Sequence, residues 1–322
     1  MWEWGGATLG LVILLLSGDA LVRGAVNLSL RLGMAPLIVS LIVVGFGTSA
    51  PELLVAISAL YDDAPQIALG NVIGSNIANI LLVLGVPALL SNLHTSEFDS
   101  RRCYVLMIIA SVVFTGLAFG GQFTWMSGLV MLAVLAGILY DSLRAALRHP
   151  ERRAPRALIE GCDVKEQIDG ADPDMPWWKL IGFLLLGMVG LPLGADVLVD
   201  NAVGIASRLM VSETVIGLTL IALGTSLPEL ATTTMAALRR QADIALGNVL
   251  GSNIFNLLGI IGIASLIGTI PVDAAILRFD LWVMLTTSVL LIPFVFFKRN
   301  VTFPWGVALS SFYVIYIIAV FF

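Results

Sequence analysis

Charged residues, cysteines and histidines are all scarce in this chain. Of its 322 residues only 12% are charged, whereas 58% are hydrophobic, and the mean hydropathy is +0.99. About one quarter of a soluble domain is charged, so this composition excludes a soluble globular protein and predicts a polytopic membrane protein. The two cysteines, Cys103 and Cys162, are too few and too scattered for a disulfide framework or a cysteine metal site.

The chain contains two copies of one sequence, displaced by 177 residues. Gly47-Thr-Ser-Ala-Pro-Glu52 returns as Gly224-Thr-Ser-Leu-Pro-Glu229, and residues 70–77 return as residues 247–254. Between residues 47 and 85, 20 of 39 positions are identical to their partners without a gap. A shared period of this length indicates an internal duplication.

Apolar runs predict ten membrane spans. They are residues 7–30, 35–60, 66–90, 103–120, 123–145, 178–206, 212–238, 243–268, 277–297 and 303–321. A polar segment with four prolines, residues 146–177, separates five spans from five, and we interpret it as a linker. The predicted organisation is a first five-helix repeat over residues 1–145 and a second over residues 178–322.

Basic residues predict the orientation of the spans. One set of alternate loops, the linker and their flanks hold 14 of the 17 basic residues: Arg31, Arg101, Arg102, Arg144, Arg148, Arg152, Arg153, Arg156, Lys165, Lys179, Arg239, Arg240, Lys298 and Arg299. Because positive residues stay in the cytoplasm, we expect a cytoplasmic linker and both termini outside a prokaryotic inner membrane. Five spans before the linker give the second half the opposite orientation. The predicted fold is therefore an all-α membrane protein of two inverted five-helix repeats, as in many secondary transporters.

Two carboxylates lie inside predicted spans. Glu52 and Glu229 fall near the middle of spans 2 and 7, where a charge costs several kcal/mol and normally serves a function. The alternative is a neutral Glu bound to a neighbouring helix. Pro51 and Pro228 remove an amide donor, so each span is predicted to break just before its Glu and to free backbone carbonyls.

The second motif adds a polar stripe to spans 3 and 8, because its polar side chains are spaced four apart on one helical face. The stripe consists of Asn71, Ser75 and Asn79 with the partners Asn248, Ser252 and Asn256. These residues either line a site or join neighbouring helices. Gly74 and Gly251 permit a break or a close helix approach, and we predict breaks in both spans.

The polar groups of the two motifs are hard oxygen ligands. Carboxylates, hydroxyls, amides and carbonyls suit Ca²⁺, Na⁺ or Mg²⁺, and no Cys or His lies in either motif. Ca²⁺ accepts six to eight flexible oxygens, whereas Mg²⁺ sheds water reluctantly, so a dehydrated pocket favours Ca²⁺. Two glutamates are neutralised by one Ca²⁺ or by two Na⁺, an equality that fits an exchanger.

Four further charged residues lie in spans 1 and 6. Asp19 and Arg23 are four apart and are predicted to form a pair on the helix surface. Asp196 lies 177 residues after Asp19, and neither it nor Asp200 has a basic residue at the matching place. The sequence leaves their role open.

The paired motifs resemble those of the calcium/cation antiporter superfamily, and most closely the prokaryotic sodium/calcium exchangers. The resemblance covers nearly the whole chain. It implies a secondary active antiporter, not an enzyme, that exchanges Na⁺ for Ca²⁺ by alternating access while spans 1 and 6 slide over a fixed core. The expected partners are these two ions and the lipid bilayer; no cofactor and no nucleic acid are expected.

The resemblance also implies ion ligands. Glu52 and Glu229 would bind both ions, and the backbone carbonyls of Thr48 and Thr225 would complete the Ca²⁺ shell. The implied Na⁺ ligands are Ser49, Ser75, Ser226 and Ser252 with the carbonyls of Gly45 and Ala222. Asn79 and Asn256 match the remaining central positions, although several members of the superfamily carry an aspartate in place of Asn256.

Three other functions remain open at this level. A proton/calcium exchanger of the same superfamily typically carries Gly-Asn-x-x-Glu, where this chain has Gly74 and Gly251 in place of the Glu. A cation channel would differ in flux saturation and in its independence of a counter-gradient. An intramembrane protease would need a membrane His or a paired-Asp motif that the spans lack.

Overall fold

The computed structural model describes residues 2–93, 100–148, 171–172, 174–210, 222–297 and 299–321. The helices of the first half are α1 (Trp2–Leu32), α2 (Pro36–Val39), η1 (Ser40–Val44), α3 (Gly45–Thr48), α4 (Ala50–Tyr61), α5 (Pro65–Leu81), α6 (Gly85–Leu90), α7 (Ser100–Ala118) and α8 (Trp125–Arg148). Those of the second half are α10 (Trp177–Arg208), α12 (Ala222–Gly224), α13 (Leu227–Leu238), α14 (Ala242–Ile254), η5 (Phe255–Ile260), α15 (Ile261–Ile267), α16 (Ala274–Arg278), α17 (Asp280–Val289), α18 (Ile292–Phe296) and α19 (Phe303–Phe321).

The described residues contain nine helical segments long and apolar enough to cross a membrane. Their limits lie within a few residues of nine of the ten predicted spans. The predicted span 212–238 begins with residues 212–221, which lie outside the described residues, so only α12 and α13 represent it. Most of the predicted linker, including His149, and His94 in the loop before α7 also lie outside the described residues.

Three of the four predicted helix breaks are present. Span 2 is interrupted at Ser49 and span 7 at Thr225 and Ser226, directly before Pro51 and Pro228. Span 3 breaks between α5 and α6, after Leu81 and ahead of Pro87, and passes unbroken through Gly74. The predicted break in span 8 is wrong, because α14, η5 and α15 follow one another without interruption. No proline lies in that segment; the π-helical η5 widens the helix instead.

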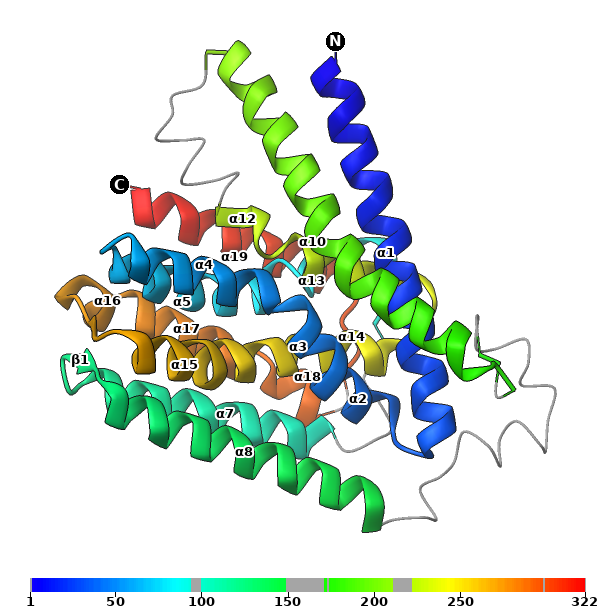
Figure 1. The fold of residues 1–322 in the computed structure, drawn as a ribbon, viewed down its shortest axis with the longest axis horizontal. Coiled ribbons are helices and arrows are strands. Elements are labelled where there is room, and N and C mark those ends of the chain that lie inside the picture. Colours follow the sequence, from blue (N-terminus) through cyan, green and yellow to red (C-terminus); the bar gives the residue numbers. More distant parts are fainter. Residues whose placement is uncertain are drawn as a thin grey trace.

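Helices α1 and α10 form an antiparallel pair that projects beyond the block formed by the other helices (Figure 1). Glycines allow the two backbones to approach closely. A Cβ at Gly10 would lie 2.5 Å from the backbone nitrogen of Leu198, and one at Gly187 would lie 2.5 Å from Cβ of Leu21. The displacement of 177 relates Gly10 to Gly187 and Leu21 to Leu198, so the pair makes the same contact twice.

The helices of the block cross just as closely at the centre. A Cβ at Gly251 in α14 would lie 2.3 Å from the carbonyl oxygen of Leu41 in η1, and one at Gly45 would lie 2.9 Å from the backbone of Gly251. Two short antiparallel pairings join the loops: β1 (Gln122–Phe123) with β2 (Ile270–Pro271), and Leu93 with Val301. This packing fixes the breaks of the first repeat against α14 of the second.

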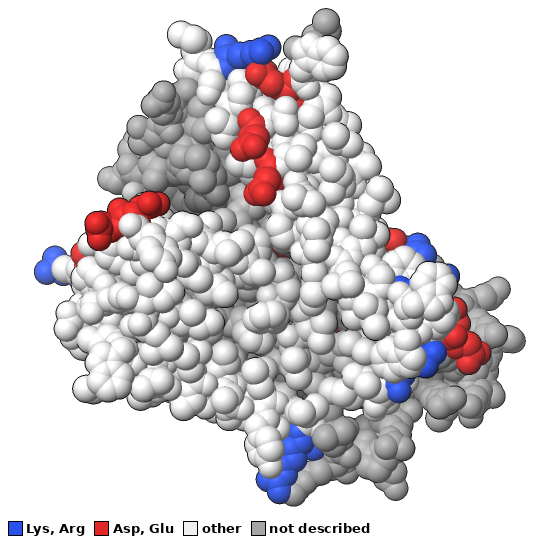
Figure 2. All heavy atoms as spheres, in the orientation of Figure 1, with Lys and Arg blue, Asp and Glu red and all other residues white. Residues whose placement is uncertain are grey.

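Charged side chains lie mainly at the ends of the helices, and a broad uncharged surface lies between them (Figure 2). This distribution matches a protein that faces lipid around its middle. A short row of acidic side chains lies over the projecting α1–α10 pair. The end of the linker region is anchored to α1, because Arg31 donates to the carbonyl of Met175 (2.6 Å) and Asn27 accepts from the backbone of Asp172 (2.7 Å).

Candidate functional site

The two predicted carboxylates occupy matching positions in the broken spans. Glu52 is the third residue of α4 and Glu229 the third of α13, and both are fully buried. Each helix begins after a non-helical serine, Ser49 or Ser226, whose side chain caps nothing. Because Pro51 has no amide hydrogen, the carbonyl of Gly47 lacks the donor that a continuous helix would provide. The break therefore places a carboxylate, a hydroxyl and free backbone carbonyls together.

The buried oxygens of this site lack protein donors. Neither oxygen of Glu52 or of Glu229 accepts a hydrogen bond from the described residues. Asn248 joins the two breaks, because it accepts from the hydroxyl of Thr48 (3.1 Å) and donates to the backbone carbonyl of Glu229 (3.3 Å). The other buried side-chain oxygens without a partner among the described residues include Ser49 Oγ, Ser75 Oγ, Asn79 Oδ1, Ser226 Oγ and Asn256 Oδ1. Burying two unpaired carboxylates costs several kcal/mol or more unless a cation compensates them.

Hydrogen bonds between the repeats hold the broken segments in place. The hydroxyl of Thr48 donates to Oδ1 of Asn248 (3.1 Å), and that of Thr225 donates to Oδ1 of Asn71 (3.2 Å). The displacement of 177 converts one bond into the other. Both threonine side chains are thus occupied, which leaves their backbone carbonyls as the groups that could face an ion.

Ser252 and Gly45 contact each other across the two repeats. The Ser252 hydroxyl lies 3.2 Å from Oγ1 of Thr48 and 3.5 Å from the carbonyl oxygen of Gly45. The backbone of Ala222 begins α12, and its side chain lies outside the described set. All the other predicted site residues flank the two helix breaks or lie on α5 or the α14–η5 helix.

Asn79 and Asn256 differ in their surroundings. The amide of Asn79 donates to Oδ1 of Asn253 (3.1 Å), and Asn253 in turn donates to the sulfur of Met107 (3.7 Å). Asn79 therefore has its Oδ1 free and its nitrogen engaged. Asn256, in the π-helical η5, has no partner for either amide atom among the described residues. A π-helical turn is wider than an α-helical turn, so the side chain of Asn256 occupies a different position from the one it would have in a regular α-helix.

Two residues that support the site are absent from the predicted set. Asn253 orients Asn79, and its place in the Gly-Ser-Asn-Ile motif was a usable signal. Thr233 is fully buried and accepts from the amide of Asn248 (3.0 Å), which also donates to the carbonyl of Glu229 (3.3 Å). Its repeat partner is Ala56, so the duplication gave no indication of Thr233.

A cavity of about 420 Å³ borders the site. Its walls include Asn71, Ser75 and Thr225, and it reaches Asp280, whose carboxylate accepts a hydrogen bond from Tyr316 (3.0 Å). The segment that the repeat pairs with α2 and η1 is 213–221, which lies outside the described residues.

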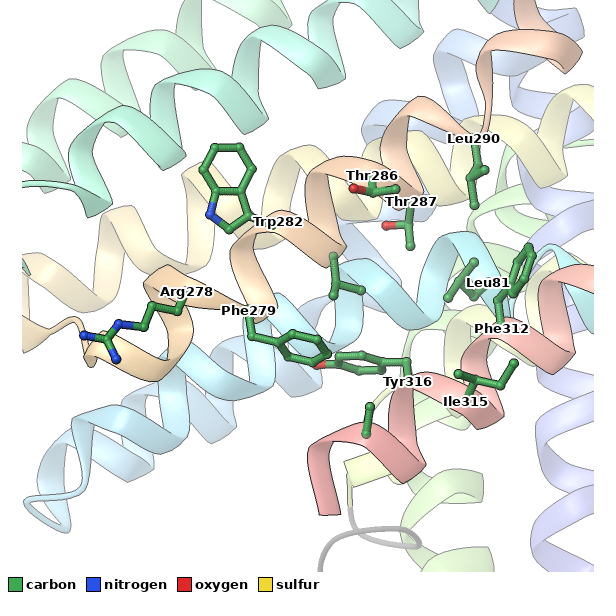
Figure 3. A pocket seen from close by; sticks show the side chains of 12 residues that line it. Leu81, Arg278, Phe279, Trp282, Thr286, Thr287, Leu290, Phe312, Ile315 and Tyr316 are labelled. Carbon is green, nitrogen blue, oxygen red and sulfur yellow. The ribbon is translucent and has the colours of Figure 1, made fainter. Parts of the chain in front are cut away.

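A larger groove of about 580 Å³ lies on the apolar surface between α17 and α19 and contains none of the predicted ligands (Figure 3). Trp282 and Thr286 line it from α17, and Phe312 and Ile315 line it from α19. The ring of Phe279 stacks on that of Tyr316 at one end (centroids 6.3 Å apart). The groove is a feature of the lipid-facing surface, distinct from the buried oxygen site.

The sequence profile of the sodium/calcium exchanger protein family matches residues 2–143 and 179–322. This chain is a member of that family. The sodium/calcium exchanger MaX1 of Methanosarcina acetivorans is 32% identical over 344 residues, covering 98% of this chain and 97% of its own. The inner membrane protein YrbG of Escherichia coli K12 is 35% identical over 284 residues, covering 88% and 85%.

Solved structures agree with the assignment. The sodium-calcium exchanger NCX_Mj, soaked with Na⁺ and Ca²⁺, superposes with a TM-score of 0.80 at 28% identity, covering 98% of this chain and 97% of its own. The exchanger described here is thus an integral membrane protein and a cation/Ca²⁺ antiporter. The predicted resemblance is confirmed, and so is the all-helical membrane fold.

Proposed function

We propose that this exchanger moves Na⁺ and Ca²⁺ across the membrane in opposite directions, so that the gradient of one ion drives the other. The observation that carries the proposal is the pair of buried carboxylates, Glu52 and Glu229, with no protein donor among the described residues. One Ca²⁺ or two Na⁺ neutralise the pair equally. Ca²⁺ and Na⁺ neutralise the same two carboxylates, so one ion must leave before the other can bind. This competition is the basis of exchange.

The ligand set proposed for the two ions combines unpartnered side-chain oxygens with backbone carbonyls and with Ser252, whose hydroxyl also contacts Thr48 and Gly45. Glu52 and Glu229, with the backbone carbonyls of Thr48 and Thr225, form the Ca²⁺ shell, since Ca²⁺ takes carboxylate and carbonyl oxygens readily. The flanking Na⁺ ligands are Ser49, Ser75, Ser226 and Ser252 with the carbonyls of Gly45 and Ala222. Asn79 supplies a free Oδ1 beside the carboxylates, and Asn256 supplies a second neutral amide.

The helix crossing at Gly251 favours Na⁺ coupling over proton coupling. A glutamate at this position is the mark of the proton-coupled exchangers of the superfamily. A Cβ at Gly251 alone would lie 2.3 Å from the Leu41 carbonyl oxygen, so no larger side chain fits without separating η1 from α14. Among the predicted ligands, Glu52 and Glu229 are then the titrating groups, and both are needed for the cation.

The architecture we propose is ten helices in two inverted five-helix repeats. The paired contacts Thr48–Asn248 and Thr225–Asn71, which the 177-residue displacement interconverts, support an approximate two-fold relation between the halves. Both termini lie outside the inner membrane, and the 146–177 linker lies in the cytoplasm. Transport proceeds by alternating access, with α1 and α10 sliding together along the block that holds the site.

Uptake of Ca²⁺ into proteoliposomes loaded with Na⁺ tests this function. We expect uptake only when the Na⁺ gradient is directed outward, with collapse of the gradient stopping it. Uptake driven by a pH gradient without Na⁺ would assign proton coupling instead. Flux that needs no counter-gradient and does not saturate would assign a channel.

A further inference from the structure

The C-terminal end of α13 is joined to α1 by charged side chains that do not belong to the proposed ion site. Asp19 of α1 accepts from Nε of Arg23 (2.9 Å) and also from Nε of Arg239, the residue that ends α13. Arg239 is 10% exposed and Asp19 18% exposed, so water screens this pair far less than a surface pair. Asp19 thus links the mobile α1–α10 pair to the block.

Helix α1 packs closely on α13 beside this link. A Cβ at Gly18 would lie 3.2 Å from the carbonyl oxygen of Ala231, and Thr232 next to it is fully buried. The hydroxyl of Thr232 has no hydrogen-bond partner among the described residues. A buried, unsatisfied hydroxyl in a seam between two helices is the kind of group that meets water or an ion when the seam opens.

The repeat-related surface of α4 is uncovered. The partner of Ala231 is Leu54, which is 66% exposed against 7% for Ala231, and α10 makes no packing with α4 comparable to that of α1 with α13. Within the part of the chain that the structure describes, the α1–α10 pair therefore closes one side of the block and leaves the related surface of α4 uncovered. Under the proposed topology the closed side is the cytoplasmic side.

Charge is inverted between the two related turns. Asp62-Asp63 after α4 and Arg239-Arg240 after α13 have the same backbone, with φ of 54° at Asp63 and 56° at Arg240. The partner of Asp19 is Asp196 on α10, which is exposed and forms no ion pair with a described residue. An attraction between Asp19 and Arg239 on one side thus corresponds to two acids, Asp196 and Asp62, on the other.

We propose that the Asp19–Arg239 ion pair, with Arg23 holding Asp19, is a lock that keeps the α1–α13 seam closed to the cytoplasm and stabilises the outward-facing state. When α1 and α10 slide to open this seam, the pair separates. The same movement brings Asp196 toward Asp62, where two acids repel. The lock rests on the proposed alternating access, and it adds an energetic preference for one of the two states.

Labelling of a cysteine in the seam tests the lock. In full-length protein with Cys103→Ala and Cys162→Ala, reconstituted in vesicles, a membrane-impermeant thiol reagent is applied from the linker side to the Thr232→Cys variant. We expect Asp19→Asn and Arg239→Gln each to raise the labelling rate on the order of tenfold. This increase corresponds to a tenfold shift of the equilibrium from the closed seam toward the open seam. Arg239→Lys should retain most of the protection, and Asp200→Asn, an exposed acid on α10 that the lock does not use, should leave the rate unchanged.

A second test adds a new ion pair on the side of α4 and α10 and breaks no existing contact. Asp62→Arg offers Asp196 a partner and should raise cytoplasmic labelling of Thr232→Cys. Adding Asp196→Asn should abolish that rise, and Asp63→Arg, the same charge change one residue away, should produce none. Unchanged labelling in both Asp19→Asn and Arg239→Gln would overturn the lock.

The labelling assay needs neither Na⁺ nor Ca²⁺, so it separates the lock from the proposed function. A labelling shift together with failure of Na⁺-driven uptake would reject the function and retain the lock. Normal Na⁺-driven uptake with no labelling shift would reject the lock alone.

Discussion

At the scale of single residues, the site is defined by which oxygens the protein leaves without donors. Glu52 and Glu229 have none among the described residues, while the hydroxyls of Thr48 and Thr225 are used to join the repeats. Side chains of similar chemistry therefore have different roles a few ångströms apart. In the proposed site the carboxylates bind the ion, and the threonine hydroxyls position the broken backbone.

Replacing either carboxylate by its amide should abolish Ca²⁺ transport. Glu52→Gln or Glu229→Gln keeps the volume and removes one of two charges, which matters more for a divalent ion than for a monovalent one. We expect the initial rate of uptake to fall on the order of a hundredfold or more. Asp200→Asn, an exposed residue of α10, is the matched control. Near-normal uptake by a folded Gln variant would show that the ion binds elsewhere.

Acid should inhibit the exchanger. A protonated carboxyl group is neutral, so each proton on Glu52 or Glu229 competes directly with the cation. Initial Ca²⁺ uptake into Na⁺-loaded vesicles should therefore decrease as the pH is lowered from about 8 to about 6. An increase over the same interval would contradict competition at the carboxylates.

Transport should not require K⁺. The resemblance to the superfamily implies that its K⁺-dependent members carry an aspartate in place of Asn256, whereas here both Asn79 and Asn256 are neutral amides. Among the described residues, the centre of the proposed site therefore offers no carboxylate beyond Glu52 and Glu229 for an additional monovalent cation; Asp280 lies further off, in the wall of the bordering cavity, where it accepts from Tyr316. Uptake with choline outside should match uptake with K⁺ outside at the same ionic strength. An absolute K⁺ requirement would overturn this role for Asn256.

At the scale of helices, prolines and glycines decide how the site is built. Pro51 and Pro228 set the breaks before the carboxylates, whereas span 8 has no proline and stays continuous. Gly45 and Gly251 let η1 and α14 cross almost in backbone contact. A membrane helix pair of this kind is held by close packing and by hydrogen bonds across it.

A methyl group at this crossing should destabilise the protein. Gly251→Ala places Cβ 2.3 Å from the Leu41 carbonyl, and we expect a loss of about 1–3 kcal/mol in the free energy of unfolding with reduced transport. Gly137→Ala on α8 is the control, because its Cβ would meet nothing within 4 Å and alanine favours a helix. Thermal unfolding in detergent measures both. Equal stability of the two variants would contradict the tight crossing.

At the scale of the whole molecule, duplication produces both the site and the moving part. The site forms where segments of the two repeats meet, and the α1–α10 pair makes the same glycine contact twice. The two halves are not equivalent in charge, since acidic Asp62-Asp63 corresponds to basic Arg239-Arg240. Under the proposed alternating access, the repeats give two related states, and we expect this charge difference to make their energies unequal.

The topology has a direct test. With the native cysteines removed, Asp63→Cys and Gly161→Cys should react with an impermeant thiol reagent from opposite sides of the membrane, because an odd number of spans separates them. Labelling from the same side would reject the inverted repeat. Arg240→Cys, the repeat partner of Asp63, should label from the Gly161 side.

The sequence by itself determined the membrane class, the nine described spans within a few residues, the duplication and the two buried carboxylates. These properties follow from local hydropathy, from proline at particular positions and from identity between the two copies. It also indicated the Asp19–Arg23 pair, because residues four apart meet on any helix.

Only the tertiary structure decided which polar groups are engaged. The partners of Thr48 and Asp19 are Asn248 and Arg239, 200 and 220 residues away, and nothing in the local sequence specifies them. Thr233 entered the site through a helix contact that its repeat partner, Ala56, cannot make. The break in span 3 lies at residues 82–84. Span 8 is not broken, and its helix continues through the π-helical segment η5. Hydrogen bonds and helix register depend on how the helices cross, and that is fixed only when both repeats pack together.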